Sequence, residues 1–125
     1  MSKTSGVQSP QFENVTPLIP AGPDLQSALD LYQRMGFSIE WHDGNGAGIK
    51  RGSVHFNLVC NDNREWASNA SFSIAVSDLR SLYEEFRNLP ATVGPLETKP
   101  WGRVEFHLII PPGVCLQFYE VESRL

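Results

Sequence analysis

Three histidines and two carboxylates are the residues of this chain that could bind a metal ion or move a proton. They are His42, His55 and His107, with Glu105 and Glu120 as the carboxylates. Two imidazoles and a carboxylate can hold a transition metal, and a single histidine can act as a general base near neutral pH. No His-x-His pair and no helical His-x-x-x-His spacing supports a metal site. We therefore expect His107 to hydrogen-bond within a ligand site, with a displaced metal site or a general base as the alternatives.

Three tryptophans could instead hold a flat organic molecule. Trp41, Trp66 and Trp101 lie outside the helical patterns and beside polar residues, and Gly102 lets the backbone approach whatever the indole of Trp101 covers. An indole face stacks on planar rings and attracts cations. A buried tryptophan is also an ordinary core residue, so the residues alone leave both interpretations open.

Two amphipathic helices are predicted, and they repeat. Asp24–Met35 and Asp78–Leu89 carry apolar residues at i, i+3, i+4, i+7 and i+10, and adding 54 to each apolar position of the first gives the second. Both segments open with Asp-Leu-x-Ser, so each aspartate can accept a hydrogen bond from a helix-start amide. The chain therefore contains two copies of one unit.

Predicted strands flank the two helices in the same order. They are Asn14–Ile19, Phe37–His42, Ile49–Arg51 and Val54–Cys60 in the first unit, and Ser71–Ser77, Thr92–Val93, Val104–Ile110 and Val114–Val121 in the second. A polar linker, Asn61–Ala70, joins the units. We predict one α+β domain over residues 13–125, made of two tandem βαβββ units (about 13–60 and 71–121) with curved mixed sheets and outer helices. Residues 1–12 are expected to be an N-terminal arm or a disordered tail.

Strand alternation predicts which side chains face away from the helices. They are His55, Asn57, Ser71, Ser73, Glu105, His107, Cys115, Gln117 and Tyr119. Two curved sheets with polar concave faces form a trough, which is where a ligand would bind.

Composition excludes several classes of protein. The net charge of −4 argues against a nucleic-acid partner, because phosphates need clustered Lys and Arg. No run approaches the roughly 20 apolar residues that span a bilayer, so no membrane role is expected. The N-terminal MSKTSGVQSPQFEN lacks the apolar stretch of a secretory signal, which favours the cytoplasm.

Three segments carry a resemblance to a known superfamily. They are VTPLIPAGPDLQSALDLYQRMGF (Val15–Phe37), IAVSDL (Ile74–Leu79) and PWGRVEFHLIIPPGVCLQFYE (Pro100–Glu120). Over roughly residues 13–121, the chain resembles the vicinal oxygen chelate superfamily of glyoxalases and ring-opening dioxygenases, and within it the bleomycin resistance proteins. The last segment is similar to that family's Trp-Gly, Glu-Phe and Pro-x-Gly pattern around its final hairpin.

The resemblance implies where a metal ion would bind. Metal-using members place ligands on the first and last strands of each unit, and these positions fall at or beside Thr16, at Asn57, at Ser71 and at Gln117. None of these is a histidine or carboxylate, whereas transition metals prefer imidazole, thiolate or carboxylate. We therefore predict neither a metal nor another cofactor.

The resemblance also implies a ligand site. Bleomycin resistance proteins hold a flat cationic drug against aromatic residues at places matching Trp41 and Trp101, so these two are expected to stack on a planar, cationic, antibiotic-like ligand. The residues expected to orient it or to shape the wall are His55, Asn57, Ser71, Gly102, His107, Gly113, Gln117 and Tyr119. A homodimer with the ligand at its interface, acting by sequestration without catalysis, is the function implied. The alternatives are a glyoxalase-like lyase or isomerase with His107 or Glu105 as base, and a sensor module that binds a metabolite.

Overall fold

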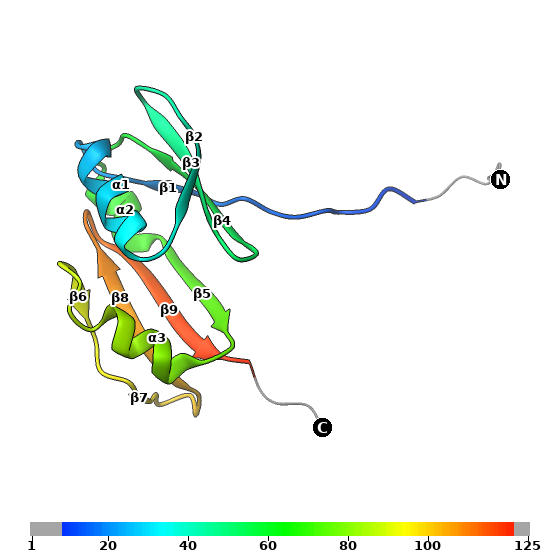
Figure 1. Cartoon of the computed structure of the whole chain (residues 1–125), viewed down its shortest axis with the longest axis vertical. Coiled ribbons are helices and arrows are strands. Elements are labelled where there is room, and N and C mark those ends of the chain that lie inside the picture. The colour runs from blue at the N-terminus through cyan, green and yellow to red at the C-terminus, as the bar shows by residue number, and fades with distance from the viewer. Residues whose placement is uncertain (1–8, 122–125) are drawn as a thin grey trace.

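The chain folds into two sheets with helices packed on one side of them (Figure 1). The structure is a computed structural model that describes residues 9–121. In chain order the elements are β1 (Leu18–Pro20), α1 (Leu25–Arg34), β2 (Ser38–His42), β3 (Gly46–Arg51), β4 (Val54–Val59), α2 (Arg64–Asn69), β5 (Ser71–Val76), α3 (Leu79–Phe86), β6 (Thr92–Val93), β7 (Glu97–Thr98), β8 (Val104–Ile110) and β9 (Val114–Glu120). The predicted α+β class is confirmed.

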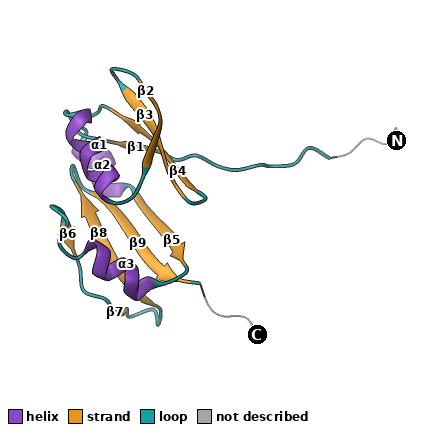
Figure 2. Ribbon diagram, in the orientation of Figure 1, coloured by secondary structure: helices purple, strands orange, loops and turns teal. Residues whose placement is uncertain are grey.

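The two sheets share one topology. The first has the strand order β1-β4-β3-β2, and the second has the order β5-β9-β8-β6, with β7 also paired to β8. In each sheet the first strand of the unit runs parallel to the last, and the other pairs are antiparallel. Figure 2 shows the two sheets one above the other, with α3 lying across the second.

Both long helices begin with the same cap. Asp24 accepts a hydrogen bond from the Ser27 amide at 3.2 Å, and Asp78 accepts one from the Ser81 amide at 3.1 Å. Each serine hydroxyl donates to the same carboxylate at 2.8 Å. These hydrogen bonds lower the pKa of both aspartates. The capping predicted from the repeated Asp-Leu-x-Ser is confirmed.

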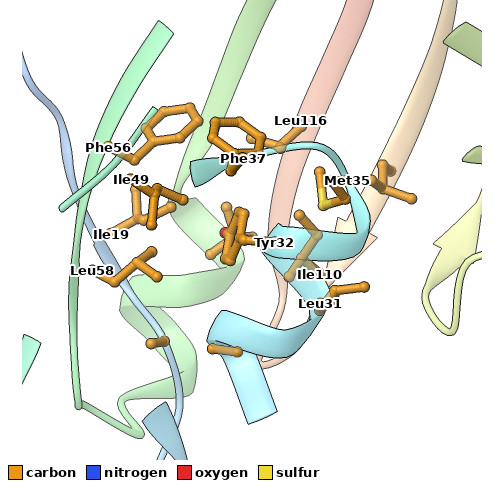
Figure 3. Packing of buried hydrophobic residues seen from close by; sticks show 14 of the residues in the cluster. Ile19, Leu31, Tyr32, Met35, Phe37, Ile49, Phe56, Leu58, Ile110 and Leu116 are labelled. Atoms are coloured by element: carbon orange, nitrogen blue, oxygen red, sulfur yellow. The ribbon is translucent and has the colours of Figure 1, made fainter. Parts of the chain in front are cut away.

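One core joins the two units. Figure 3 shows Tyr32 of α1 between Ile49 and Ile19 of the first sheet and Ile110 of the second, with Met35, which follows α1, on the side of Ile110. The second sheet is covered by α3, and the rings of Phe86 and Phe118 lie edge to face there, 5.6 Å apart. The apolar side of each sheet is thus used in the core, which leaves the other side uncovered by helices.

The first strand and the linker differ from the prediction, and one short strand was not predicted. The first strand begins at Leu18 instead of Asn14, because Pro17 has no amide hydrogen to donate to a ladder and contributes only its carbonyl, to the Asn57 amide. The predicted linker contains α2, which Asn63 caps by accepting from the Trp66 amide. The sequence hides this helix because it is only six residues long and buries only Ala67. The two-residue β7 was also missed.

The described part of the N-terminal segment runs away from the domain (Figure 1). Phe12 is fully exposed, and Val15 is 82% exposed. The rest of the predicted arm or tail, residues 1–8, lies outside the described residues. Within residues 9–121, no helix is both long and apolar enough to cross a membrane.

Candidate functional site

The strand register gathers the predicted polar residues on the helix-free side of the second sheet. Across β8, β9 and β5, Glu105 is paired with Tyr119, Gln117 lies between His107 of β8 and Ser73 of β5, and Cys115 is paired with Ser71. We call this surface the second open face; it comprises Ser71, Ser73, Glu105, His107, Cys115, Gln117 and Tyr119. The intervening residues of β8 and β9 are apolar and buried in the core. The predicted alternation of these two strands is confirmed.

The carboxylate of Glu105 is the centre of this face. It is fully buried, although only side chains of the same sheet face cover it. Its Oε2 accepts hydrogen bonds from Trp101 Nε1 at 2.8 Å and Arg103 Nε at 2.6 Å, and its Oε1 lies 2.8 Å from His107 Nε2. Burial alone would raise the pKa of Glu105, but hydrogen bonds from Trp101, His107 and Arg103, with the charge of Arg103, outweigh it and lower the pKa to about 2.

Trp101 is anchored at its polar edge and open on its ring. Its indole is nearly parallel to the His107 ring, at 15° and 6.2 Å between centroids, which is an offset arrangement. The residue is nevertheless 60% exposed. Gly102 follows with a φ of +94°, a left-handed conformation that favours glycine and turns the chain back toward β8. The Trp-Gly pair therefore presents a fixed aromatic surface to solvent.

Arg103 and Tyr119 form the next part of the face. The Arg103 guanidinium lies 3.7 Å from the centroid of the Tyr119 ring, stacked over it. Because Arg103 also donates to Glu105, the guanidinium is held on two sides.

An amide network occupies the β5 side of the second open face. Gln117 Nε2 donates to Ser71 Oγ at 3.0 Å, and Ser73 Oγ donates to Gln117 Oε1 at 3.3 Å. Burial raises the pKa of the neighbouring Cys115 thiol. The network is neutral, so it suits hydrogen bonding to a ligand and not ion pairing.

Trp41 lies on the helix-free side of the first sheet, on a floor of glycine. It is paired with Gly48, and Gly48 is paired in turn with Asn57. A Cβ at Gly48 would overlap Trp41 Nε1, so only glycine allows the indole to lie there. Trp41 remains 47% exposed. We call Trp41, Gly48, His55 and Asn57 the first open face.

A β-bulge brings an additional carboxylate to this face. The β2–β3 register shifts between Ile39 and Trp41, so Glu40 is an extra residue in its strand. Its Oε1 lies 3.2 Å from His55 Nδ1. His55 therefore already has a partner within the chain.

The structure divides the predicted site residues between the two sheets. Ser71, His107, Gln117 and Tyr119 belong to the second sheet, Trp101 and Gly102 to the loop between its strands β7 and β8, and Trp41, His55 and Asn57 to the first sheet. In Figure 1, β2 lies at the top of the molecule and the segment between β7 and β8 at the bottom. The two tryptophans predicted to stack on one ligand are therefore not brought together within one chain.

Three contributors were missed as ligand-site residues by sequence reasoning: Arg103, Gly48 and Glu105, the last having been considered only as a base or metal ligand. The signal for the first and last was present, because Trp101, Arg103, Glu105 and His107 alternate with a period of two. No comparable signal exists for Gly48, whose role depends on a register that crosses strands.

The residues of the alternative displaced metal site are not brought together in the described part of the chain. His107 is bonded to Glu105 on the second sheet, and His55 is bonded to Glu40 on the first. Glu120 accepts from the Leu79 amide at the start of α3. Among residues 9–121, no three His, Cys, Asp or Glu side chains are grouped so that they could hold a metal ion.

The hollows of the surface lie elsewhere. Cavities of about 410 and 460 Å³ are lined by residues of α1 and of α3 respectively, and one of about 510 Å³ lies at the β8–β9 hairpin. Gly113 lines the last of these and faces Ala67 of α2. Gly113 is therefore not placed on the same side of the sheet as the second open face, and the other predicted site residues line none of these three cavities.

Comparison with known proteins gives the fold a name. No protein-family model matches the chain, and no curated protein matches it. A solved bleomycin-binding protein from the bleomycin-producing Streptomyces verticillus, in complex with copper(II)-bleomycin, is similar at a TM-score of 0.79 and 24% identity, covering 91% of this chain and 100% of that one. A bleomycin-binding protein complexed with bleomycin gives 0.78 and 22%, covering 89% and 100%. A bleomycin resistance determinant encoded on the transposon Tn5 gives 0.77 and 22%, covering 90% and 100%. The two-sheet arrangement that carries both open faces is thus the fold of the bleomycin-binding proteins.

Proposed function

We propose that this chain binds a planar, aromatic, antibiotic-like small molecule and sequesters it without breaking a bond. The observation that carries the proposal is Trp101: its N–H is fixed by a buried carboxylate while more than half of the residue stays exposed. A large aromatic surface held rigid in solvent costs little further entropy when a flat ring stacks on it. The bleomycin-binding proteins of similar fold, solved with bleomycin bound, support an antibiotic as the ligand.

A second copy of the chain would complete the site. Trp41 and Trp101 lie on different sheets, so a ring held between two indoles needs Trp41 from one protomer and Trp101 from another. The exposed Phe12 and Val15 of the extended N-terminal segment, with the exposed Leu18, offer apolar contacts for a partner. We therefore propose a homodimer, with the ligand at its interface and residues 1–12 acting as an arm.

The cationic character of the ligand is supported by the indoles alone. Glu105 already accepts from three side chains, Glu40 faces His55, and Glu97 is bonded to Lys99 Nζ at 3.0 Å. A positive charge on the ring system would thus be stabilised by cation–π attraction to Trp41 and Trp101.

The geometry disfavours Glu105 as a general base. A general base is most effective when its pKa lies near the working pH, and the pKa of Glu105 is about 2. The bond from His107 to Glu105 orients the imidazole, an arrangement that general bases also use, so the test below includes a search for an altered ligand.

Tryptophan replacement tests the proposal. A panel of planar drugs and aromatic metabolites is screened by thermal shift, because a ligand that binds the folded state raises Tm by mass action. For the ligands found, W101F should weaken binding about fivefold, since an aromatic stack contributes about 1 kcal/mol and phenylalanine has no N–H with which Glu105 could hold the ring in place. W66F, in α2, is the matched control and should bind normally. Unchanged affinity in W101F, or recovery of a chemically altered ligand by mass spectrometry, would show the function to be a different one.

A further inference from the structure

Arg103 has hydrogen-bonding capacity that the chain does not use. Its Nε donates to Glu105, and its plane lies over Tyr119, which together fix the guanidinium. Among residues 9–121, Glu105 is the only hydrogen-bond partner of the Arg103 guanidinium, which leaves both Nη groups with free N–H bonds. Its side chain is 40% exposed, so these groups can be reached from solvent.

The free Nη groups form an anion-binding fork. A guanidinium presents parallel N–H bonds that match the two oxygens of a carboxylate, or of a phosphate or sulfate group. No nearby carboxylate of the described chain competes for them, because Glu105 is saturated by three donors and Glu97 is bonded to Lys99.

The Nη groups of Arg103 lie close to the indole of Trp101. Trp101 Nε1 and Arg103 Nε both bond to the same oxygen, Glu105 Oε2, so they are no more than about 5.5 Å apart. That is about the distance from the middle of a bicyclic ring to an oxygen of its carboxyl substituent. A ring stacked on Trp101 therefore places an acidic substituent within reach of Arg103.

We infer, on the basis of the proposed function, that the Nη groups of Arg103 bind an oxyanion substituent on the aromatic ligand. The ligand class is then a planar ring system that carries a carboxylate, phosphate or sulfate next to the stacked ring, while any positive charge belongs to the ring system itself, where the indoles attract it. Glu105 acts as the positioning residue, because it holds the indole and the guanidinium in register.

Three matched probes test this inference on the full chain: 2-naphthoate, 2-naphthamide and 2-naphthylmethylammonium. Affinities are measured by calorimetry, and the Nε–Hε signal of Arg103 is followed by NMR. The native protein should bind naphthoate at least about tenfold more tightly than the amide, as expected for hydrogen bonds between two charged groups. R103Q should reduce naphthoate to the affinity of the amide and leave the amide unchanged. R103K, which keeps the charge but loses the fork, should give an intermediate affinity.

R87Q is the matched control, because Arg87 follows α3, on the helix side of the second sheet, and is paired with Glu84. It should retain the full preference for naphthoate. Equal affinity of the three probes for the native protein, or the same preference in R103Q, overturns the Arg103 subsite and leaves the binding function standing. If none of the probes binds the native protein, the aromatic-binding function itself fails, and the subsite with it. If R103Q alters only the sedimentation behaviour, the guanidinium contacts another protomer and the inference is wrong.

Discussion

Replacement of Glu105 should destabilise the fold and release Trp101 at the same time. The carboxylate holds Trp101, Arg103 and His107 at 2.6 to 2.8 Å. Alanine removes all three hydrogen bonds. Glutamine can keep them, because its amide oxygen can accept from Trp101 and Arg103 while its NH2 group donates to His107. Comparison of E105A with E105Q therefore separates the loss of hydrogen bonds from the loss of charge.

The size of the effect follows from the structure in two ways. A hydrogen bond to a charged group contributes about 1.5–3 kcal/mol, but Trp101 and Arg103 can reach water once released, so we expect E105A to cost about 2–3 kcal/mol in all. A carboxyl whose pKa falls from 4.5 to about 2 also stabilises the folded chain at neutral pH, and because solvent screens its exposed donors this contribution falls within the same range. For a chain of 125 residues, the loss of about 2–3 kcal/mol in E105A corresponds to a decrease in Tm of roughly 8–12 °C. E105Q should lose about half as much.

The effect of E105Q should depend on pH. Because the pKa of Glu105 is lower in the folded chain than its ordinary 4.5, its stabilising contribution is fully present above pH 4.5. It is lost as the pH falls toward 2. The native protein should thus exceed E105Q in stability at pH 7, and the difference should shrink between pH 4.5 and 2, while the other carboxylates cancel in the comparison.

Thermal and urea unfolding at fixed protein concentration measure the stability lost in each variant and its dependence on pH. The mobility of Trp101 is measured by fluorescence anisotropy in a variant that lacks the other two tryptophans. If E105A lowers the free energy of unfolding by less than about 0.5 kcal/mol, the stabilising role of Glu105 is refuted, since that is within the range of an ordinary surface substitution. A gap between native protein and E105Q that is the same at pH 7 and pH 2.5 would refute the assigned charge state.

Three further predictions concern other parts of the chain. G48A should displace Trp41, because a Cβ there overlaps the indole, and should weaken binding of planar ligands about tenfold. G44A is the control, with nothing within 4 Å of the added atom, and should bind normally. Equal binding by the two variants would contradict the role of Gly48 in seating the indole. F12A should weaken self-association about tenfold or more in analytical ultracentrifugation with little change in the unfolding of the monomer, since Phe12 is fully exposed in the single chain; unchanged association would remove the N-terminal segment from the interface. D24A and D78A should each lower the free energy of unfolding by about 1 kcal/mol in urea, because the two caps make the same hydrogen bonds. A loss at one helix only would show that the two repeated caps do not stabilise the chain equally.

Much of the fold was predictable because its signals are local. The helix periods, the Asp-Leu-x-Ser caps and the alternation of β8 and β9 all lie within a dozen residues of sequence. The helix α2 was not predictable, because it has one buried residue and no apolar stripe. The late start of β1 depends on Pro17, whose missing amide hydrogen is visible in the sequence.

The site was predictable only in part, because its two halves depend on different kinds of information. The group around Glu105 could be predicted from alternation along one segment, because its members occupy every second position from Trp101 to His107. The position of Trp41 depends on the bulge at Glu40 and on pairing with Gly48, and both are set by the meeting of two strands. A bulge carries no reliable mark in a single sequence.

The division of the aromatic residues between the sheets links ligand binding to association. Trp41 lies on the first open face and Trp101 beside the second, so a monomer offers one indole to a ligand, whereas the proposed dimer offers two when it joins unlike faces. A ligand that stacks on both binds the dimer better than the monomer by some factor, and thermodynamic linkage requires that it tighten the dimer correspondingly. Sedimentation with and without ligand measures that factor directly. If a tight aromatic ligand leaves the dimer dissociation constant unchanged, the two tryptophans do not share one ligand.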